Sequence, residues 1–208
     1  MVKRMTRHLE NLIPLSRRAL SSALALAGES EEPVFAVDAT VGNGHDTLFL
    51  AERAGERGRV WAFDVQEAAI VFARERFRRD APDLLGRVVF AHAGHETAGE
   101  VLPPEAAGRV WAAVFNLGFL PGSDKRVKTA APTTLRALES LAAVLAVGGV
   151  LSVHSYRGHD GGGEEDEAVR QWFEDRSWES WRVAEYFFGN KRRNREILYL
   201  AERISAAG

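Results

Sequence analysis

The 208-residue sequence contains no cysteine. The protein can therefore form no disulfide bond, hold no metal through thiolates and use no cysteine nucleophile. The sequence also lacks any stretch near the ~20 apolar residues that a membrane-spanning helix needs, so we expect no membrane partner and a cytoplasmic location. Positive charge is not in excess either, because the formal net charge is −2. Any contact with a nucleic acid must therefore come from local basic clusters.

The composition is that of a folded globular protein, with 46% hydrophobic and 27% charged residues. The length suits one domain, so we predict a single domain over residues 1–208 that begins with an N-terminal helical extension over residues 1–30. Residues 9–27 have amphipathic helical spacing, and Pro14 marks a helix start or a break between two helices. A secretory signal peptide would also join basic and apolar residues, but the helical spacing of the leucines favours a helix.

The most informative stretch is residues 34–46, where an apolar strand leads into a glycine turn and then a helix. Residues 34–37 are apolar and partly β-branched, as a central parallel strand requires. Gly42 and Gly44 can adopt positive φ and carry no side chain that would block a ligand. Asp46 stands where a cap or first-turn acid is expected. A bare turn at a helix N-terminus predicts a cradle for a ligand with a polar or charged end.

The residues around the turn narrow the choice of ligand. A dinucleotide fingerprint requires a third glycine where this sequence has Thr47, and no lysine follows Gly44 as a phosphate-binding loop would require. The next predicted strand, residues 59–64, ends in Asp64, which lies 22 positions after Gly42. A carboxylate at that distance can accept hydrogen bonds from both hydroxyls of a ribose. A short glycine turn with this acid indicates S-adenosylmethionine rather than NAD.

Strands and helices alternate along the rest of the chain. We predict helices over residues 67–79, 133–147 and 164–173, with Gly148 and Gly149 ending the second of them. Further strands are predicted over residues 87–92, 109–115 and 150–154, before a C-terminal hairpin of residues 180–188 and 196–201. This pattern predicts an α/β fold with a mostly parallel seven-stranded sheet, an antiparallel C-terminal hairpin, and helices on both faces.

Polar residues follow the third and fourth of these strands, at the sheet edge where ligands bind in open α/β folds. His95 and Glu96 follow the third strand and are either contacts for adenine or solvated loop residues. Asn116 directly follows the fourth strand, where its amide can accept an N–H from a substrate amine. A local Asx turn is the alternative interpretation of Asn116.

His154, Tyr156 and His159 follow the fifth strand and indicate a functional lip at the same edge. His159 and Asp160 alone do not make a metal site, so we expect no bound metal.

Four segments, in this order, resemble one known family: DATVGNGHDTLFLA, AFDVQE, FNLGFLPGSDK and HSYRGHDGGGEE. They are similar to rRNA methylases with a Rossmann-like class I methyltransferase fold, a family that includes bacterial tRNA 5-(aminomethyl)-2-thiouridine methyltransferases. The resemblance covers about residues 10–203. It implies S-adenosylmethionine as methyl donor and methylation of the aminomethyl nitrogen on the wobble uridine of tRNA.

The resemblance also implies roles for individual residues. Asp38 and the glycine turn would hold the methionine end of the donor, and Asp64 with Gln66 would hold its ribose and adenosine. The full set of predicted cofactor residues is Asp38, Gly42, Asn43, Gly44, Asp46, Thr47, Asp64, Gln66, His95, Glu96 and Asn116.

The segment from Asn116 would form the substrate wall through Gly118, Phe119 and Pro121. Phe119 stands where a tyrosine is expected and Ser123 where a glycine is common, so Phe119 receives no polar role. The flipped wobble base would stack on Phe119 or Tyr156.

Two basic clusters, one in the predicted turn of the C-terminal hairpin and one after the substrate wall, are either solvated or contacts for phosphates of a tRNA anticodon stem-loop. The clusters are Lys191-Arg192-Arg193-Asn194-Arg195 and Lys125-Arg126-Lys128. From them, Lys191, Arg192 and Lys125 are predicted to contact the substrate, and His154 on the lip is a further predicted substrate contact. The oligomeric state is left open, and a homodimer is one alternative.

Asn116 would orient the neutral amine for attack, and Tyr156, His159 or His154 would relay its proton. A methyltransferase for rRNA or for a small-molecule amine is the alternative in the same class. A nucleotide-binding module without catalysis is the alternative from another class.

Overall fold

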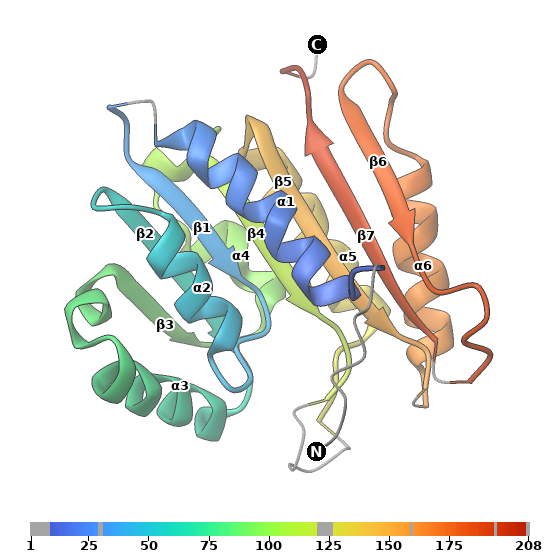
Figure 1. Cartoon of the computed structure of the whole chain (residues 1–208), viewed down its shortest axis with the longest axis horizontal. Coiled ribbons are helices and arrows are strands. Elements are labelled where there is room, and N and C mark those ends of the chain that lie inside the picture. Colours follow the sequence, from blue (N-terminus) through green and yellow to red (C-terminus); the bar gives the residue numbers. More distant parts are fainter. Residues whose placement is uncertain (1–8, 29–30, 120–126, 159, 194, 207–208) are drawn as a thin grey trace.

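The computed structural model describes residues 9–28, 31–119, 127–158, 160–193 and 195–206. Its sheet has the order β3-β2-β1-β4-β5-β7-β6 (Figure 1). The strands are β1 (Val34–Asp38), β2 (Gly58–Asp64), β3 (Val88–His92), β4 (Val110–Asn116), β5 (Leu145–Tyr156), β6 (Trp181–Tyr186) and β7 (Glu196–Arg203). The first five pair in parallel, whereas β7 pairs antiparallel with both β5 and β6. The predicted seven-stranded sheet with its C-terminal hairpin is confirmed.

Helices cover both faces of this sheet, as Figure 1 shows. The helices are α1 (Leu12–Ala27), α2 (His45–Arg53), α3 (Glu67–Asp80), α4 (Ala98–Val101), α5 (Ala131–Val144) and α6 (Gly162–Glu174), with short 3-10 helices at Pro82–Arg87, His95–Thr97 and Pro104–Ala106. Apolar residues of α1, α2 and α3 share one core with the strands, and those of α4, α5 and α6 share another. Within the described ranges, no helix is both long and apolar enough to cross a membrane.

The N-terminal helix α1 is one continuous element, with Pro14 in its first turn. A proline is tolerated there because the first N–H groups of a helix have no intrahelical partner. Leu20 and Leu24 are buried against the sheet, and the Ser16 hydroxyl lies 2.6 Å from the Ser152 hydroxyl of β5. The helix therefore lies across the central strands, and its first half reaches the carboxyl edge of the sheet.

The prediction that Gly148 and Gly149 end a helix is wrong. Helix α5 ends at Val144, and Leu145 already begins β5. Leu145 fits the apolar stripe of a helix as well as the buried row of a strand, and it is buried in the structure. Gly148 instead has φ +87° inside β5, beside the register shift between β4 and β5. A glycine within a strand commonly marks such an irregularity.

Candidate functional site

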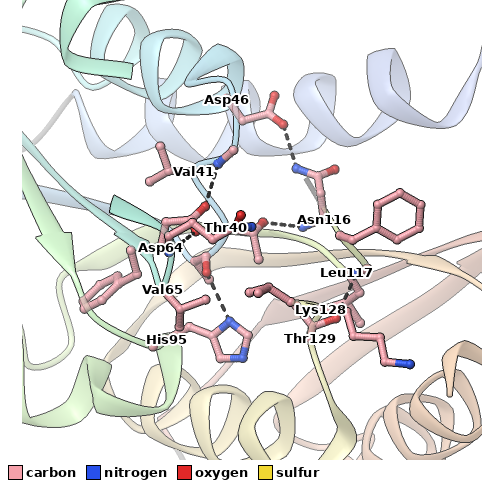
Figure 2. Close-up of a pocket in the computed structure, with 18 of the residues that line it drawn as sticks. Thr40, Val41, Asp46, Asp64, Val65, His95, Asn116, Leu117, Lys128 and Thr129 are labelled. Carbon is pink, nitrogen blue, oxygen red and sulfur yellow. Dashed lines mark hydrogen bonds between the residues drawn. The ribbon is translucent and has the colours of Figure 1, made fainter. Parts of the chain in front are cut away.

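A pocket of about 780 Å³ opens at the carboxyl ends of the central strands, where the strand order reverses between β1 and β4 (Figure 2). This reversal point is where ligands bind in open α/β sheets. The predicted site residues that line the pocket are Gly42, Asn43, Asp46, Asp64, Gln66, His95, Glu96, Asn116, Gly118, Phe119 and Tyr156. Five loops and strand ends therefore bring most of the predicted site together.

Other predicted site residues lie elsewhere. Those outside the pocket lining are Asp38, Gly44, Thr47, His154, Lys191 and Arg192. Pro121, Lys125 and His159 lie outside the described residues.

The glycine turn is shaped by close packing against α3. Gly42 has φ +50° and Gly44 has φ +73°, a region that residues with a side chain rarely adopt. A Cβ at Gly44 would lie 2.9 Å from Cβ of Ala73, so α3 leaves no room for one. Arg76 of α3 donates from Nε to the Asn43 carbonyl oxygen at 2.7 Å. The turn is thus held with its backbone bare on the pocket side.

Asp64 ties this turn to the start of α3. Its Oδ2 accepts from the Gly42 N–H at 2.9 Å, and its Oδ1 accepts from the Gln66 N–H at 2.9 Å. Each carboxylate oxygen can accept more than one hydrogen bond, so both retain capacity for a ligand hydroxyl. A ribose diol at the mouth of β2 fits these acceptors.

Asp38 supports the turn from beneath and is fully buried. Its carboxyl accepts from the Thr47 hydroxyl at 2.6 Å and from the Thr40 N–H at 3.1 Å. Burial raises the pKa of Asp38 to about 7, and the negative charge of Asp46 adds to the effect. Asp38 and Thr47 thus support the loop that lines the pocket, and their own side chains do not reach the pocket surface.

This raised pKa predicts a pH-dependent contribution to folding. The folded state keeps the Asp38 proton up to about pH 7, whereas an aspartate in the unfolded chain loses it near its ordinary pKa of 3.8. The folded state therefore binds more protons between these values, and the contribution of Asp38 to stability falls as pH rises, by at most ~1.4 kcal/mol per pH unit. We expect Asp38→Asn to abolish this slope, as measured by the difference between the urea-unfolding free energies of the two proteins from pH 4 to 8. A pH-independent difference would contradict the assignment.

The side chain of His95 provides a buried hydrogen-bond acceptor in the pocket lining. Its Nδ1 lies 3.1 Å from the Ala39 carbonyl oxygen, which can only accept, so Nδ1 carries the proton. Burial lowers the pKa of His95 and keeps the ring neutral. Nε2 is then a lone acceptor, and it has no partner among the described residues. A ligand that donates an N–H or O–H, such as adenine or ribose, suits this residue of the pocket lining.

Asn116 ends β4 and is held at two points. Its backbone N–H donates to the Thr40 hydroxyl at 2.7 Å, and its side-chain Nδ2 donates to Oδ2 of Asp46 at 2.9 Å. This side-chain partner lies 70 positions away in sequence, so the contact is not that of a local Asx turn. The amide of Asn116 is therefore fixed from across the pocket.

Tyr156 begins a row of three polar side chains, of which only the middle one, His154, is buried. Its hydroxyl lies 3.1 Å from Nδ1 of His154, and Nε2 of His154 lies 3.3 Å from Oε2 of Glu196. Burial raises the pKa of Tyr156 to about 12, while burial lowers the pKa of His154. Near neutral pH the Tyr156 hydroxyl keeps its proton, and it can donate a hydrogen bond to Nδ1 of the neutral histidine. His154 reaches the pocket only through Tyr156.

The sequence did not reveal what holds the segment at Gly118, which the resemblance assigns to a substrate wall. The Gly118 N–H donates to the Thr129 hydroxyl at 2.8 Å, and that hydroxyl donates to Glu165 at 2.7 Å. The Thr134 hydroxyl donates to the other carboxylate oxygen of Glu165, which is buried. The acidic residues at the start of α6 are visible in the sequence, but no local pattern indicates these contacts with Thr129 and Thr134.

Arg17 and Ile13 of α1 also line the pocket. Among the described residues, no group of three or more histidine and acidic side chains could hold a metal.

Of the predicted basic residues, Lys191 forms an ion pair with Glu196, while Arg192 and Arg193 are exposed. Lys128 pairs with Asp160.

Comparisons with known proteins agree with this geometry. Residues 60–202 match the model of the family described as "Putative rRNA methylase". Over 147 residues, 64% of this chain, the sequence is 37% identical to the chloroplastic tRNA (mnm(5)s(2)U34)-methyltransferase of Arabidopsis thaliana. The match spans about half (50%) of that relative's length.

Two solved structures extend the similarity over nearly the whole chain. A "putative rRNA-methylase" from Clostridium thermocellum is 32% identical with a TM-score of 0.82, covering 95% of this chain and 100% of that one. A "putative methyltransferase" from Streptococcus mutans, in complex with SAH, is 30% identical with a TM-score of 0.78, covering 94% of this chain and 99% of that one.

Proposed function

Because the chain belongs to the rRNA methylase family, we propose that it transfers a methyl group from S-adenosylmethionine to the aminomethyl nitrogen of 5-aminomethyl-2-thiouridine at the tRNA wobble position. The donor is supported by the Streptococcus mutans relative, which is in complex with SAH, the product form of that donor. The substrate is supported by the name of the Arabidopsis relative. The observation that carries the proposal is Asn116, held at the end of β4 with its amide in the pocket.

The described residues fit the donor in chemical type. Asp64 would accept from the ribose hydroxyls, and His95 Nε2 would accept an N–H or O–H of the adenosine. The bare backbone of the turn at Gly42 would face the methionine end, beside the N-terminus of α2. When bound, S-adenosylmethionine supplies a methyl group that its sulfonium has already activated for displacement.

The protein's own part in the reaction is mainly to position the amine. Methyl transfer is an in-line displacement, so the amine lone pair must point at the methyl carbon, and such alignment can supply ~7–11 kcal/mol. The carbonyl oxygen of Asn116 would accept one amine N–H and so fix the direction of the lone pair. The product is an ammonium that must lose one proton. The Tyr156 oxygen would receive it while the Tyr156 hydroxyl passes its own proton to His154 Nδ1.

The proposed substrate can be tested with purified enzyme and methyl-labelled donor. Three RNAs would be compared: tRNA that carries 5-aminomethyl-2-thiouridine, the same tRNA without the modification, and rRNA. We expect nucleoside mass spectrometry to find one added methyl on the modified uridine of the first RNA alone. Label in rRNA but not in tRNA would favour the alternative that the family name suggests.

The turn between β6 and β7 is the proposed contact for tRNA phosphates. Strand β6 is parallel to β5 in direction, because both pair antiparallel with β7, so this turn lies at the same sheet edge as the pocket (Figure 1). Arg192 and Arg193 are exposed there, whereas Lys191 is engaged by Glu196. A basic surface beside the pocket would bind the anticodon stem without reading its sequence.

We expect replacement of both Arg192 and Arg193 by alanine to raise KM for tRNA about 3- to 10-fold at 0.1 M salt and to reduce the slope of binding against salt. The reason is that each lost phosphate contact removes the release of about one counterion. Steady-state kinetics and filter binding at several salt concentrations measure both quantities. Alanine at Arg78 and Arg79, an exposed pair at the far end of α3, is the matched control. An unchanged salt slope for the Arg192/Arg193 variant would show that the turn is only solvated.

A further inference from the structure

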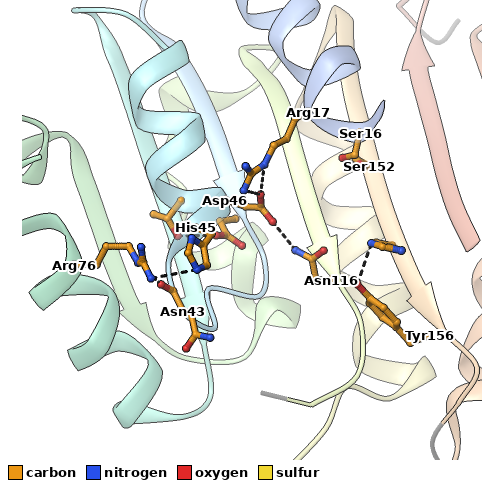
Figure 3. A network of polar contacts seen from close by, with 12 residues as sticks. Ser16, Arg17, Asn43, His45, Asp46, Arg76, Asn116, Ser152 and Tyr156 are labelled. Atoms are coloured by element: carbon orange, nitrogen blue, oxygen red, sulfur yellow. Dashed lines mark hydrogen bonds and ion pairs between the residues drawn. The ribbon is translucent and has the colours of Figure 1, made fainter. Parts of the chain in front are cut away.

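Asp46 joins the N-terminal helix to Asn116, and its two carboxylate oxygens serve different partners. Oδ1 accepts from Nε and Nη2 of Arg17 at 2.9 and 2.7 Å, whereas Oδ2 accepts from Nδ2 of Asn116 at 2.9 Å (Figure 3). The three residues come from α1, α2 and β4. The side chain of Asp46 is only 16% exposed. The contact is thus a partly buried link between three elements, with all three side chains on the pocket lining.

The chemistry of this link sets the direction of the Asn116 amide. An ionised carboxylate can only accept hydrogen bonds, so the amide nitrogen, and not its oxygen, must face Asp46. The Asn116 oxygen is then turned away from Asp46, as Figure 3 shows. Without Asp46, the planar amide could rotate by half a turn and present its N–H groups to the amine instead. Such an orientation could not accept an amine proton.

Arg17 in turn restrains Asp46. Two guanidinium N–H groups donate to the same oxygen, which anchors that oxygen and leaves the second one for Asn116. The guanidinium also lies 5.2 Å from the centre of the Phe49 ring, which restrains the arginine itself. A charged hydrogen bond of this kind is among the stronger contacts at a partly buried site.

We propose that Asp46 is a positioning residue for methyl transfer: held by Arg17, it keeps the Asn116 carbonyl oxygen directed at the incoming amine. The inference rests on the proposed function, because it takes Asn116 as the group that receives the amine. It changes the role of Asp46, which the sequence suggested as a cofactor contact. It also makes α1, which lies outside the matched residues 60–202, a part of the catalytic arrangement.

A double-mutant cycle tests this role. Asp46→Ala, Asn116→Ala and the double variant would be compared in single-turnover methylation of aminomethyl-uridine tRNA, with donor affinity measured by calorimetry. We expect Asp46→Ala alone to lower the rate about 10-fold or more, with donor Kd changed less than about 2-fold. In the Asn116→Ala background the same change should alter the rate less than about 2-fold, because Asp46 acts through Asn116. Equal effects in both backgrounds, or a weakened donor Kd with an unchanged rate, would overturn the inference.

Neighbouring arginines on α1 supply a second test that leaves Asp46 in place. We expect Arg17→Gln to lower the single-turnover rate about 3- to 10-fold, with Arg17→Lys recovering part of the loss. Arg18→Gln is the matched control, since Arg18 pairs with Glu10 at the surface. Equal rates for Arg17→Gln and Arg18→Gln would contradict the role given to Arg17. A wild-type enzyme that leaves aminomethyl-uridine tRNA unmethylated would instead contradict the proposed function itself.

Discussion

Replacing Asn116 by alanine is expected to lower kcat by ~10²-fold or more while leaving the affinity for S-adenosylmethionine nearly unchanged. Loss of the side-chain carbonyl leaves the amine lone pair free to point away from the methyl carbon, and misplacement of reactants can reduce rates by this factor. Asp64 and the glycine turn, the residues proposed to contact the donor, follow other strands and remain in place. Calorimetry with S-adenosylhomocysteine and single-turnover methylation of tRNA measure the two quantities.

The Asn116→Asp variant tests whether a charged acceptor can replace the amide of Asn116. A carboxylate could still accept from the amine, but it would stand beside Oδ2 of Asp46, where Asn116 now donates at 2.9 Å. Two carboxylates that close repel each other, and both favour the protonated amine, which cannot attack. We therefore expect this variant to stay impaired near neutral pH. A wild-type rate in the alanine variant would exclude Asn116 from catalysis and direct attention to Tyr156.

Replacing Asp64 by alanine is expected to weaken S-adenosylmethionine binding by ~1.5–3 kcal/mol, or roughly 10- to 150-fold in Kd. The variant would lose the acceptors proposed for the ribose diol. It would also release the N–H groups of Gly42 and Gln66, which Asp64 now holds at 2.9 Å each. The glycine turn, which is proposed to face the methionine end of the donor, would then be less ordered. Calorimetric titration with S-adenosylmethionine measures the loss.

Asp64→Asn separates the loss of the ribose acceptors from the release of the backbone N–H groups. Its carbonyl oxygen can keep one of the two backbone hydrogen bonds but lacks the negative charge, so an intermediate Kd is expected. Asp83→Ala, at an exposed acid of the Pro82–Arg87 turn, serves as control for the loss of charge alone. A folded Asp64→Ala variant that binds the donor as tightly as the wild type would remove Asp64 from the site.

The alternation of strands and helices could be predicted because it rests on local periodicity. Burial imposes a regular spacing of apolar residues along each element, and glycine marks the turns that need positive φ. Where the local signal was ambiguous, the prediction failed. Leu145 fits both a helical stripe and a buried strand, and the boundary between α5 and β5 was misplaced there. Only the pairing of β5 with β4 and β7 decides the case.

The position of the pocket could also be predicted from the sequence, because it depends on the direction in which the strands run. Parallel strands end at one edge, so Asp64, His95 and Asn116, each at or just after a strand end, were expected to face one ligand. They do line one pocket. The sequence could not show which of the predicted residues turn inward. Asp38 and Thr47 belong to the same motif as Gly42, yet they are fully buried and hold the turn from below.

Three features of this protein could be predicted without its structure: the set of elements, the glycine turn with its acid, and the polar residues at the strand ends. Each of these follows from neighbours along the chain. The tertiary structure alone decided the partners of those residues: Arg17 with Asp46 across 29 positions, and Asp46 with Asn116 across 70. No periodicity records such pairs, because they depend on how α1 and α2 pack over β4 and not on local spacing. The orientation of the Asn116 amide, and with it the chemistry proposed for the pocket, is therefore a property of the packed fold.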